Sequence, residues 1–134
     1  MHIHHFSEIL LVDDSSVVRN VVRKILTQLA YKNIDEAADG AEALTKISEK
    51  HFDLVISDWN MQTMSGYELL EKVRANEKCA NLRFIMMTAE STMDKVIQAK
   101  HAGVSCFIKK PFGAEELQAK ILQMDADQRS VAVA

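Results

Sequence analysis

Five polar residues stand at the ends of four short apolar runs, where they could act on one ligand. They are Asp13 and Asp14 after the first run, Asp58 at the end of the second, Thr88 at the end of the third and Lys110 after the fourth. A single acidic residue in such a place is often only a helix cap or a turn residue. Because all four runs end in such groups, the pattern favours one shared site over separate caps.

Carboxylates that are brought together repel one another, and each raises the proton affinity of the others. A divalent cation relieves this repulsion, and a ligand set made only of oxygen atoms favours Mg²⁺ over zinc. A carboxylate beside Mg²⁺ and a lysine can attack a phosphoryl group to form an aspartyl phosphate, because both cations neutralise the phosphoryl oxygens. The residue types therefore predict phosphoryl chemistry at a Mg²⁺ site.

The apolar runs themselves are the strands that would position these residues. Residues 8–13, 52–58, 84–88 and 106–110 each contain three or four consecutive apolar side chains, which is typical of strands buried on both faces. Residues 33–38 are more polar and are expected to form a strand near an edge of the sheet.

Between the strands the apolar pattern takes a helical period. The first helix is expected to begin at Ser15 or Ser16 and to bury one apolar stripe. This stripe consists of Val17, Val18, Val21, Val22, Ile25, Leu26 and Leu29. A later helix should end before Gly103. Five strand–helix units with crossovers of about 20–30 residues predict an α/β fold, a doubly wound five-stranded parallel sheet with helices on both faces. Ligands of such sheets bind outside the carboxyl ends of the strands.

Length and composition fit one globular domain. The chain has 134 residues, 48% hydrophobic and 26% charged, with 4 Gly and 1 Pro, so collagen-like and low-complexity classes are excluded. No secretory signal and no run of about 18 apolar residues is seen, and a formal charge of −3 gives no general attraction to nucleic acid or membrane lipid. We expect a cytoplasmic protein with its two cysteines reduced. Residues 1–7 should be flexible, residues 8–124 should form the domain, and residues 125–134 should fray.

Four stretches of the chain resemble the motifs of receiver domains of two-component response regulators, most closely the stand-alone, chemotaxis-type members. These stretches are residues 9–15, 55–61, 87–90 and 107–112, and the resemblance covers residues 8–124. It implies a flavodoxin-like fold and a signalling switch that is activated by phosphorylation. Such a switch catalyses only its own phosphorylation and dephosphorylation, and it is not an enzyme for an external substrate.

The resemblance also implies a role for each matching residue. Asp58 corresponds to the phosphoacceptor, and Thr88 and Lys110 to the residues that assist the transfer. The Mg²⁺ ligands would be Asp13, Asp14, Asp58 and the backbone carbonyl of Asn60. Phe107 corresponds to the aromatic switch residue that turns inward when Thr88 moves, and the Lys110–Pro111 bond is expected to be cis.

Two departures from the family pattern affect these expectations. Gln62 stands where the family usually has proline, which should loosen the loop after Asp58 and alter the lifetime of the phosphate. The switch residue Phe107 replaces the usual tyrosine and so offers no hydroxyl to a partner. Trp59 is interpreted as a half-exposed structural residue, and Lys109 as a solvated or packing side chain.

The partners that the resemblance implies are a sensor histidine kinase as phosphodonor and a protein target such as a flagellar motor switch protein. A phosphatase is a further candidate partner, and we expect a monomer that binds neither nucleic acid nor membrane. A phosphorelay intermediate or a phosphate sink stays open as an alternative role.

Two other functions use similar residues. An aspartyl-phosphate phosphohydrolase would place a second acid where this chain has Asn60, and it would usually need a cap domain. A flavin-binding module of the same fold would place a phosphate loop where Asp13 and Asp14 would repel it.

Overall fold

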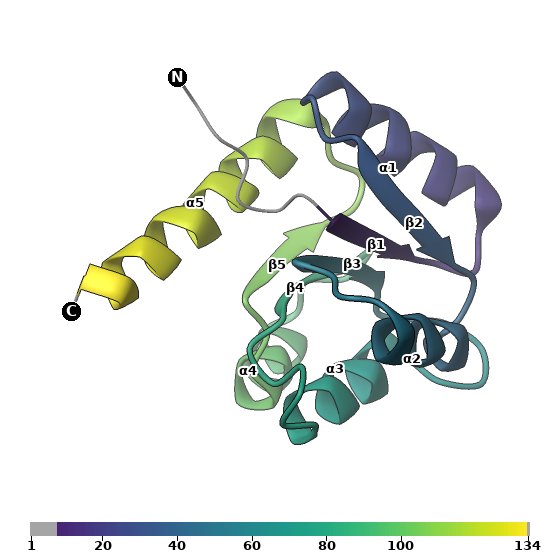
Figure 1. Ribbon diagram of the computed structural model, residues 1–134. Coiled ribbons are helices and arrows are strands. Elements are labelled where there is room, and N and C mark those ends of the chain that lie inside the picture. The colour runs from purple at the N-terminus through teal and green to yellow at the C-terminus, as the bar shows by residue number, and fades with distance from the viewer. Residues whose placement is uncertain (1–7, 134) are drawn as a thin grey trace.

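Strands and helices alternate along the computed structural model, which describes residues 8–133 and the side chains of residues 8–124 (Figure 1). The strands are β1 (Glu8–Val12), β2 (Asn33–Ala37), β3 (Leu54–Asp58), β4 (Arg83–Thr88) and β5 (Cys106–Lys109). The helices are α1 (Ser16–Gln28), α2 (Gly40–Glu49), α3 (Gly66–Ala75), α4 (Met93–Ala102) and α5 (Ala114–Val133). The five predicted strands are all confirmed. The segment 1–7 that was predicted to be flexible lies outside the described residues.

The strands form one parallel sheet in the order β2-β1-β3-β4-β5. The predicted edge position of the polar strand is confirmed, because β2 stands at the end of this order. The chain leaves β1 towards β2 on one side and leaves β3 towards β4 on the other. Open α/β sheets bind ligands at such a reversal point, outside the carboxyl ends of the strands. The fold therefore directs attention to the ends of β1 and β3.

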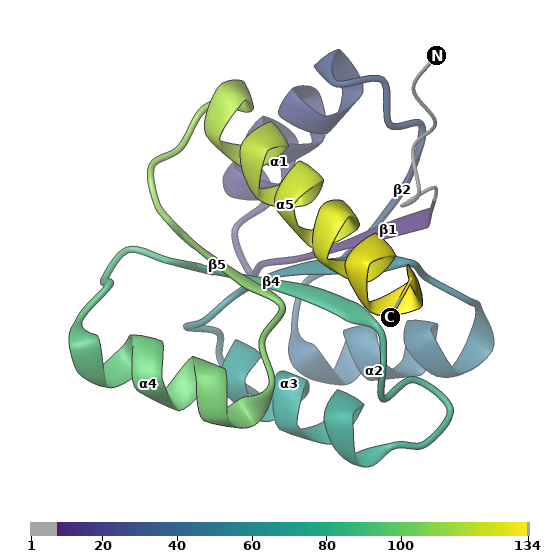
Figure 2. The ribbon, with the colours of Figure 1, turned by 90° about the vertical axis from the view of Figure 1, so that its left-hand side faces the viewer.

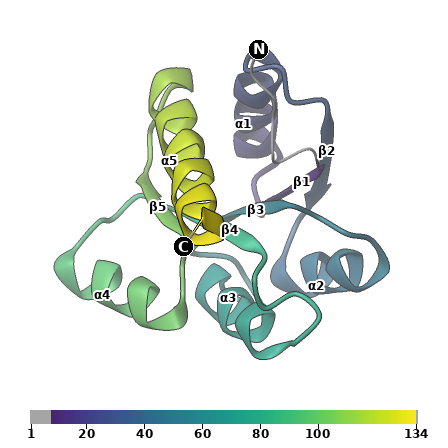
Figure 3. The same cartoon turned by 60° about the vertical axis from the view of Figure 1, so that its left-hand side comes forward.

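Helices cover both faces of the sheet, as predicted. Figures 2 and 3 show α1 and α5 on one face and α2, α3 and α4 on the other. Two apolar cores fill the layers: Ile9 and Leu11 belong to the core under α1 and α5, whereas Leu10 and Val12 belong to the other core. This alternation reflects the two-residue period of a strand, and it explains why strands buried on both faces are continuously apolar.

Helix α1 buries less of its apolar stripe than the sequence predicted. Val22 and Leu26 are buried, but Val17 and Val21 are 69% and 52% exposed. The stripe contains two adjacent rows of side chains, and only one row faces the sheet and α5. The prediction that all seven residues share a buried face is therefore wrong for Val17 and Val21.

The predicted helix boundaries agree with the observed caps. The Ser15 hydroxyl accepts a hydrogen bond from the Val18 N–H at 3.2 Å and caps α1, and Gly103 ends α4 in the left-handed conformation, with φ 92°. Helix α5 continues to Val133, beyond the last apolar residue of its stripe, Met124. The fraying of residues 125–134 stays a prediction, since side chains are described only as far as Met124. Among the described residues, no helix has the length and apolar character needed to cross a membrane.

Candidate functional site

The carboxyl ends of β1 and β3 bring three carboxylates together. One oxygen each from Asp13, Asp14 and Asp58 lies within 4.8 Å of the others. Asp13 and Asp58 are buried, with 2% and 8% exposure, whereas Asp14 is exposed. The strand pairing explains the proximity, because β1 and β3 are neighbours and both end here. The structure thus confirms that the predicted acidic residues form one cluster.

Lys110, which follows β5, reaches into this cluster. Its Nζ lies 3.2 Å from Asp13 Oδ2 and 3.1 Å from Asp58 Oδ1. Burial alone would lower the pKa of Lys110, but its hydrogen bond with Asp58 and the charges of Asp13 and Asp58 together raise it. The ammonium group therefore stays charged between two carboxylates. The Lys110–Pro111 bond is cis, as the family resemblance implied.

The surroundings of Asp58 disfavour its charged form. Burial raises the pKa of the Asp58 carboxyl, the hydrogen bond from Lys110 opposes this rise, and the negative charge of Asp13 adds to it. Burial and the neighbouring carboxylates together thus outweigh the one ammonium group. A hard cation with oxygen ligands would supply the missing positive charge, so the donor set fits such an ion.

This raised pKa predicts how stability depends on pH when no metal is present. Because the folded-state pKa of Asp58 exceeds its unfolded value, stability falls as pH rises from near pH 4, about the unfolded pKa, through the folded pKa. Asp58→Asn keeps the shape and removes the charge. We expect this variant to be more stable than the unmodified chain at pH 7, on the order of 1 kcal/mol, and to lose this advantage at pH 3. Urea unfolding in a chelating buffer measures both values.

A matched control for this prediction is Asp94→Asn, which removes an exposed carboxylate from the first turn of α4. A carboxylate there interacts favourably with the helix dipole, so this change should be neutral or slightly destabilising at pH 7. Equal effects of the two substitutions would contradict a specific cost of charge at Asp58.

Thr88 lies at the end of β4 but its hydroxyl faces the following loop. The hydroxyl donates a hydrogen bond to the Glu90 carbonyl at 2.8 Å and accepts one from the Glu90 N–H at 3.1 Å. Thr88 itself is fully buried. The structure therefore places Thr88 one residue after Met87, the strand partner of Asp58, with its hydroxyl engaged by its own loop. Its predicted contact with a phosphoryl group would require that hydroxyl to turn.

Trp59, directly after Asp58, is buried at 6% exposure, so its interpretation as half exposed is wrong. Its ring stacks on Tyr67 at 5.6 Å between centroids and meets the edge of Phe107 at 6.2 Å. Lys95 Nζ lies 4.3 Å from the Trp59 ring centroid, in a cation–π contact. The sequence did not predict the contacts of Tyr67 and Lys95 with Trp59, because nothing in the local pattern shows that α3 and α4 enclose this indole.

Phe107 packs partly buried against the core under α2, α3 and α4. Its strand partner is Met86, and Lys109 is the partner of Thr88. Since alternate residues of a strand point to one face, Thr88 and Phe107 lie on the same face of adjacent strands. This register is compatible with mechanical coupling between them, whereas the switch role of Phe107 stays a prediction.

The loop after Asp58 turns back sharply to start α3. The Gly66 N–H donates to the Trp59 carbonyl at 2.8 Å, and the Met64 N–H donates to the Gln62 carbonyl at 2.8 Å. Between them Thr63 adopts φ 71°, an unfavourable value for a β-branched residue. Asn60 is exposed at the start of this loop. The role of the Asn60 carbonyl as a Mg²⁺ ligand stays a prediction. The effect of Gln62 on the mobility of this loop also stays a prediction.

A model of one protein family, the response regulator receiver domain, matches residues 9–122. The chemotaxis protein CheY of Pseudomonas aeruginosa is 42% identical over 114 residues, which span 85% of this chain and 92% of that protein. CheY-3 of Vibrio cholerae is also 42% identical over 114 residues, 85% of this chain and 88% of that protein.

Solved structures share the fold. The chemotaxis protein CheY4 of Vibrio cholerae has a TM-score of 0.83 at 34% identity, over 89% of this chain and 98% of that chain. A CheY-like receiver domain protein of Methanospirillum hungatei has a TM-score of 0.82 at 28% identity, over 93% of this chain and 98% of that chain. The sequence and structural relatives thus agree on one family.

Proposed function

The chain belongs to the response regulator receiver domain family, the signalling switches that respond to phosphorylation, and we propose that Asp58 is its phosphoacceptor. The observation that carries this assignment is the contact of Asp58 with Lys110 inside the cluster of Asp13, Asp14 and Asp58. Family membership implies a histidine kinase as phosphodonor and a protein target downstream.

In the proposed transfer, an Asp58 carboxylate oxygen attacks the phosphorus of a phosphohistidine. The new O–P bond forms as the P–N bond breaks, and the released imidazole nitrogen keeps the electron pair. Lys110 lies between Asp13 and Asp58, where its ammonium group can follow the charge that moves onto the phosphoryl oxygens. Asp13, Asp14, Asp58 and the Asn60 carbonyl would hold Mg²⁺, which, when bound, supplies the remaining positive charge at this site.

We further propose a chemotaxis-type role for the chain in the cytoplasm, as a monomer. The support is its 42% identity to proteins named as chemotaxis CheY from two organisms. A flagellar motor switch protein is then the candidate target, and a phosphatase a candidate antagonist. The roles of phosphorelay intermediate and phosphate sink use the same chemistry and differ only in the partner that takes the signal.

Phosphoryl uptake tests the proposal. Incubation with acetyl phosphate and Mg²⁺ should add one phosphoryl group to the protein by intact mass, and Asp58→Asn should abolish the gain. The matched control Asp94→Asn removes an exposed aspartate on α4 and should keep full uptake. An Asp58→Asn protein that still gained this mass would refute the assignment, and many turnovers on a generic phosphate ester would favour a phosphohydrolase instead.

A further inference from the structure

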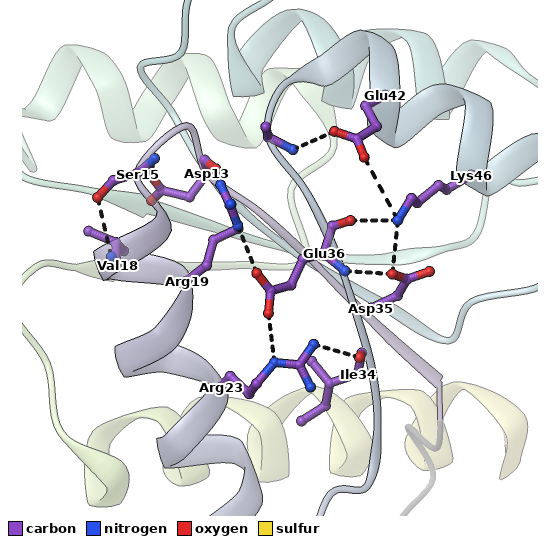
Figure 4. Close-up of polar contacts among 11 residues, drawn as sticks. Asp13, Ser15, Val18, Arg19, Arg23, Ile34, Asp35, Glu36, Glu42 and Lys46 are labelled. Atoms are coloured by element: carbon purple, nitrogen blue, oxygen red, sulfur yellow. Dashed lines mark hydrogen bonds and ion pairs between the residues drawn. The ribbon is translucent and has the colours of Figure 1, made fainter.

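A network of ionic side chains joins α1, β2 and α2 next to the acidic cluster (Figure 4). On the α1 side, Arg19 Nε lies 2.8 Å from Glu36 Oε1, and Arg23 Nε lies 2.6 Å from Glu36 Oε2. These contacts hold the pKa of Glu36 below its ordinary value, with the hydrogen bond from Arg23 as the larger cause. Glu36, on the edge strand, is therefore an ionised anchor for two arginines.

The two arginines use their remaining donors differently. Arg19 Nη1 donates to the backbone carbonyl of Asp13 at 2.5 Å. Arg23 Nη2 donates instead to the Ile34 carbonyl at 2.9 Å, away from the carboxylates. The Arg19 side chain is also less exposed, at 17% against 38% for Arg23. Arg19 and Arg23 lie one helical turn apart and both bind Glu36. They differ in that Arg19 also reaches the Asp13–Asp14 turn, whereas Arg23 does not.

The Asp13 carbonyl belongs to the turn that must stay closed for the carboxylates to meet. The Asp13 N–H donates to the Ala37 carbonyl at 3.1 Å, and Asp13 Oδ1 accepts from the Ser15 N–H at 2.9 Å. Charge repulsion between Asp13, Asp14 and Asp58 acts to open this turn. Arg19 joins this turn to Glu36, because its Nη1 donates to the Asp13 carbonyl and its Nε contacts the Glu36 carboxylate (Figure 4).

We propose that Arg19, anchored by Glu36, is a positioning residue that holds the Asp13–Asp14 turn in the geometry that binds Mg²⁺. This inference rests on the proposed Mg²⁺ site. Residues that orient metal ligands from behind commonly change metal affinity by about 10- to 100-fold when they are replaced. The planar guanidinium suits the role because it donates to two acceptors in fixed directions, which the point charge of a lysine does not.

Charge alone predicts the opposite result. Arg19 is a cation close to a cation site, so its removal should tighten Mg²⁺ binding if only Coulomb repulsion matters. If Arg19 positions the turn, its removal should weaken Mg²⁺ binding in spite of the lost positive charge. The sign of the change therefore distinguishes the two explanations.

The test is a Mg²⁺ titration of the full chain, followed by the amide signals of Asp13, Asp14 and Ser15. We expect Arg19→Met to lower Mg²⁺ affinity about tenfold and Arg19→Lys to restore only part of it. The matched control Arg23→Met breaks the other contact with Glu36 and should change affinity less than twofold. Without metal, the Ser15 amide signal should shift in Arg19→Met and stay in place in Arg23→Met.

Other results would overturn the proposal. Tighter Mg²⁺ binding in Arg19→Met would show that Arg19 affects the ion only through charge repulsion and does not position the turn. Equal losses of stability in the two methionine variants, with unchanged Mg²⁺ affinity, would make Arg19 a purely structural residue. If Arg19→Met does not fold, Arg19→Gln removes the same positive charge with a polar side chain and must lower Mg²⁺ affinity at least threefold, whereas charge alone predicts tighter binding. The metal site itself would be refuted if the unmodified chain showed no response to Mg²⁺, or if its response persisted in Asp14→Ala.

Discussion

Replacing Gly66 with alanine should destabilise the protein by about 3 kcal/mol or more, a large effect for one methyl group. A Cβ atom at Gly66 would lie 2.0 Å from the Asp58 carbonyl oxygen and 3.0 Å from Met86 Sδ. The Asp58 carbonyl is restrained, because it accepts a hydrogen bond from the Ser57 hydroxyl at 2.9 Å and because Asp58 pairs with Met87 of β4. The first turn of α3 would have to move away from the strand that carries the proposed phosphoacceptor.

Gly113→Ala is the matched control. A Cβ atom there would meet nothing within 4 Å, so this variant should stay within about 1 kcal/mol of the unmodified chain. Urea unfolding compares the three proteins, and the same samples can be tested for phosphoryl uptake. A Gly66→Ala protein as stable as the Gly113→Ala protein would contradict the close approach of α3 to Asp58.

The sequence predicts those features of the fold that depend on the local order of apolar and polar residues. Continuous apolar runs such as Leu10 to Val12 identify strands buried on both faces, and the polar composition of residues 33–38 identifies an edge strand. Once the strands are parallel, topology alone gathers their carboxyl ends. For this reason the cluster of Asp13, Asp14, Asp58 and Lys110 could be predicted before any distance was known.

The parts that could not be predicted depend on contacts between distant segments. Trp59 is buried because α3 supplies Tyr67 and α4 supplies Lys95 around its ring. The link from Arg19 to Asp13 requires β2 to place Glu36 beside α1. In α1 the apolar period predicts the helix, but it does not indicate which of two adjacent rows the sheet covers, so the exposure of Val17 and Val21 could not be predicted.

Thr88→Val should disconnect Phe107 from Asp58 while leaving the acidic cluster intact. In the structure the Thr88 hydroxyl is held by Glu90, so a phosphoryl group on Asp58 would have to draw it away from both contacts. A hydrogen bond to a charged group contributes about 1.5–3 kcal/mol, which is about 10- to 100-fold in the equilibrium between two packings. Valine keeps the buried shape of Thr88 and removes the hydroxyl, and with it both the two contacts with Glu90 and the hydrogen bond to the phosphoryl group.

Amide signals measured with Mg²⁺ and beryllofluoride, a phosphoryl mimic, test the coupling. In the unmodified chain the signals near both Asp58 and Phe107 should shift, because Thr88 and Phe107 share one face of adjacent strands. In Thr88→Val the shift near Asp58 should remain, and the shift near Phe107 should fall to about a tenth. Thr88→Ser retains the hydroxyl and should keep both. Equal responses at Phe107 in the valine and serine variants would show that the hydroxyl does not transmit the signal, and that any coupling runs through packing around Trp59 instead.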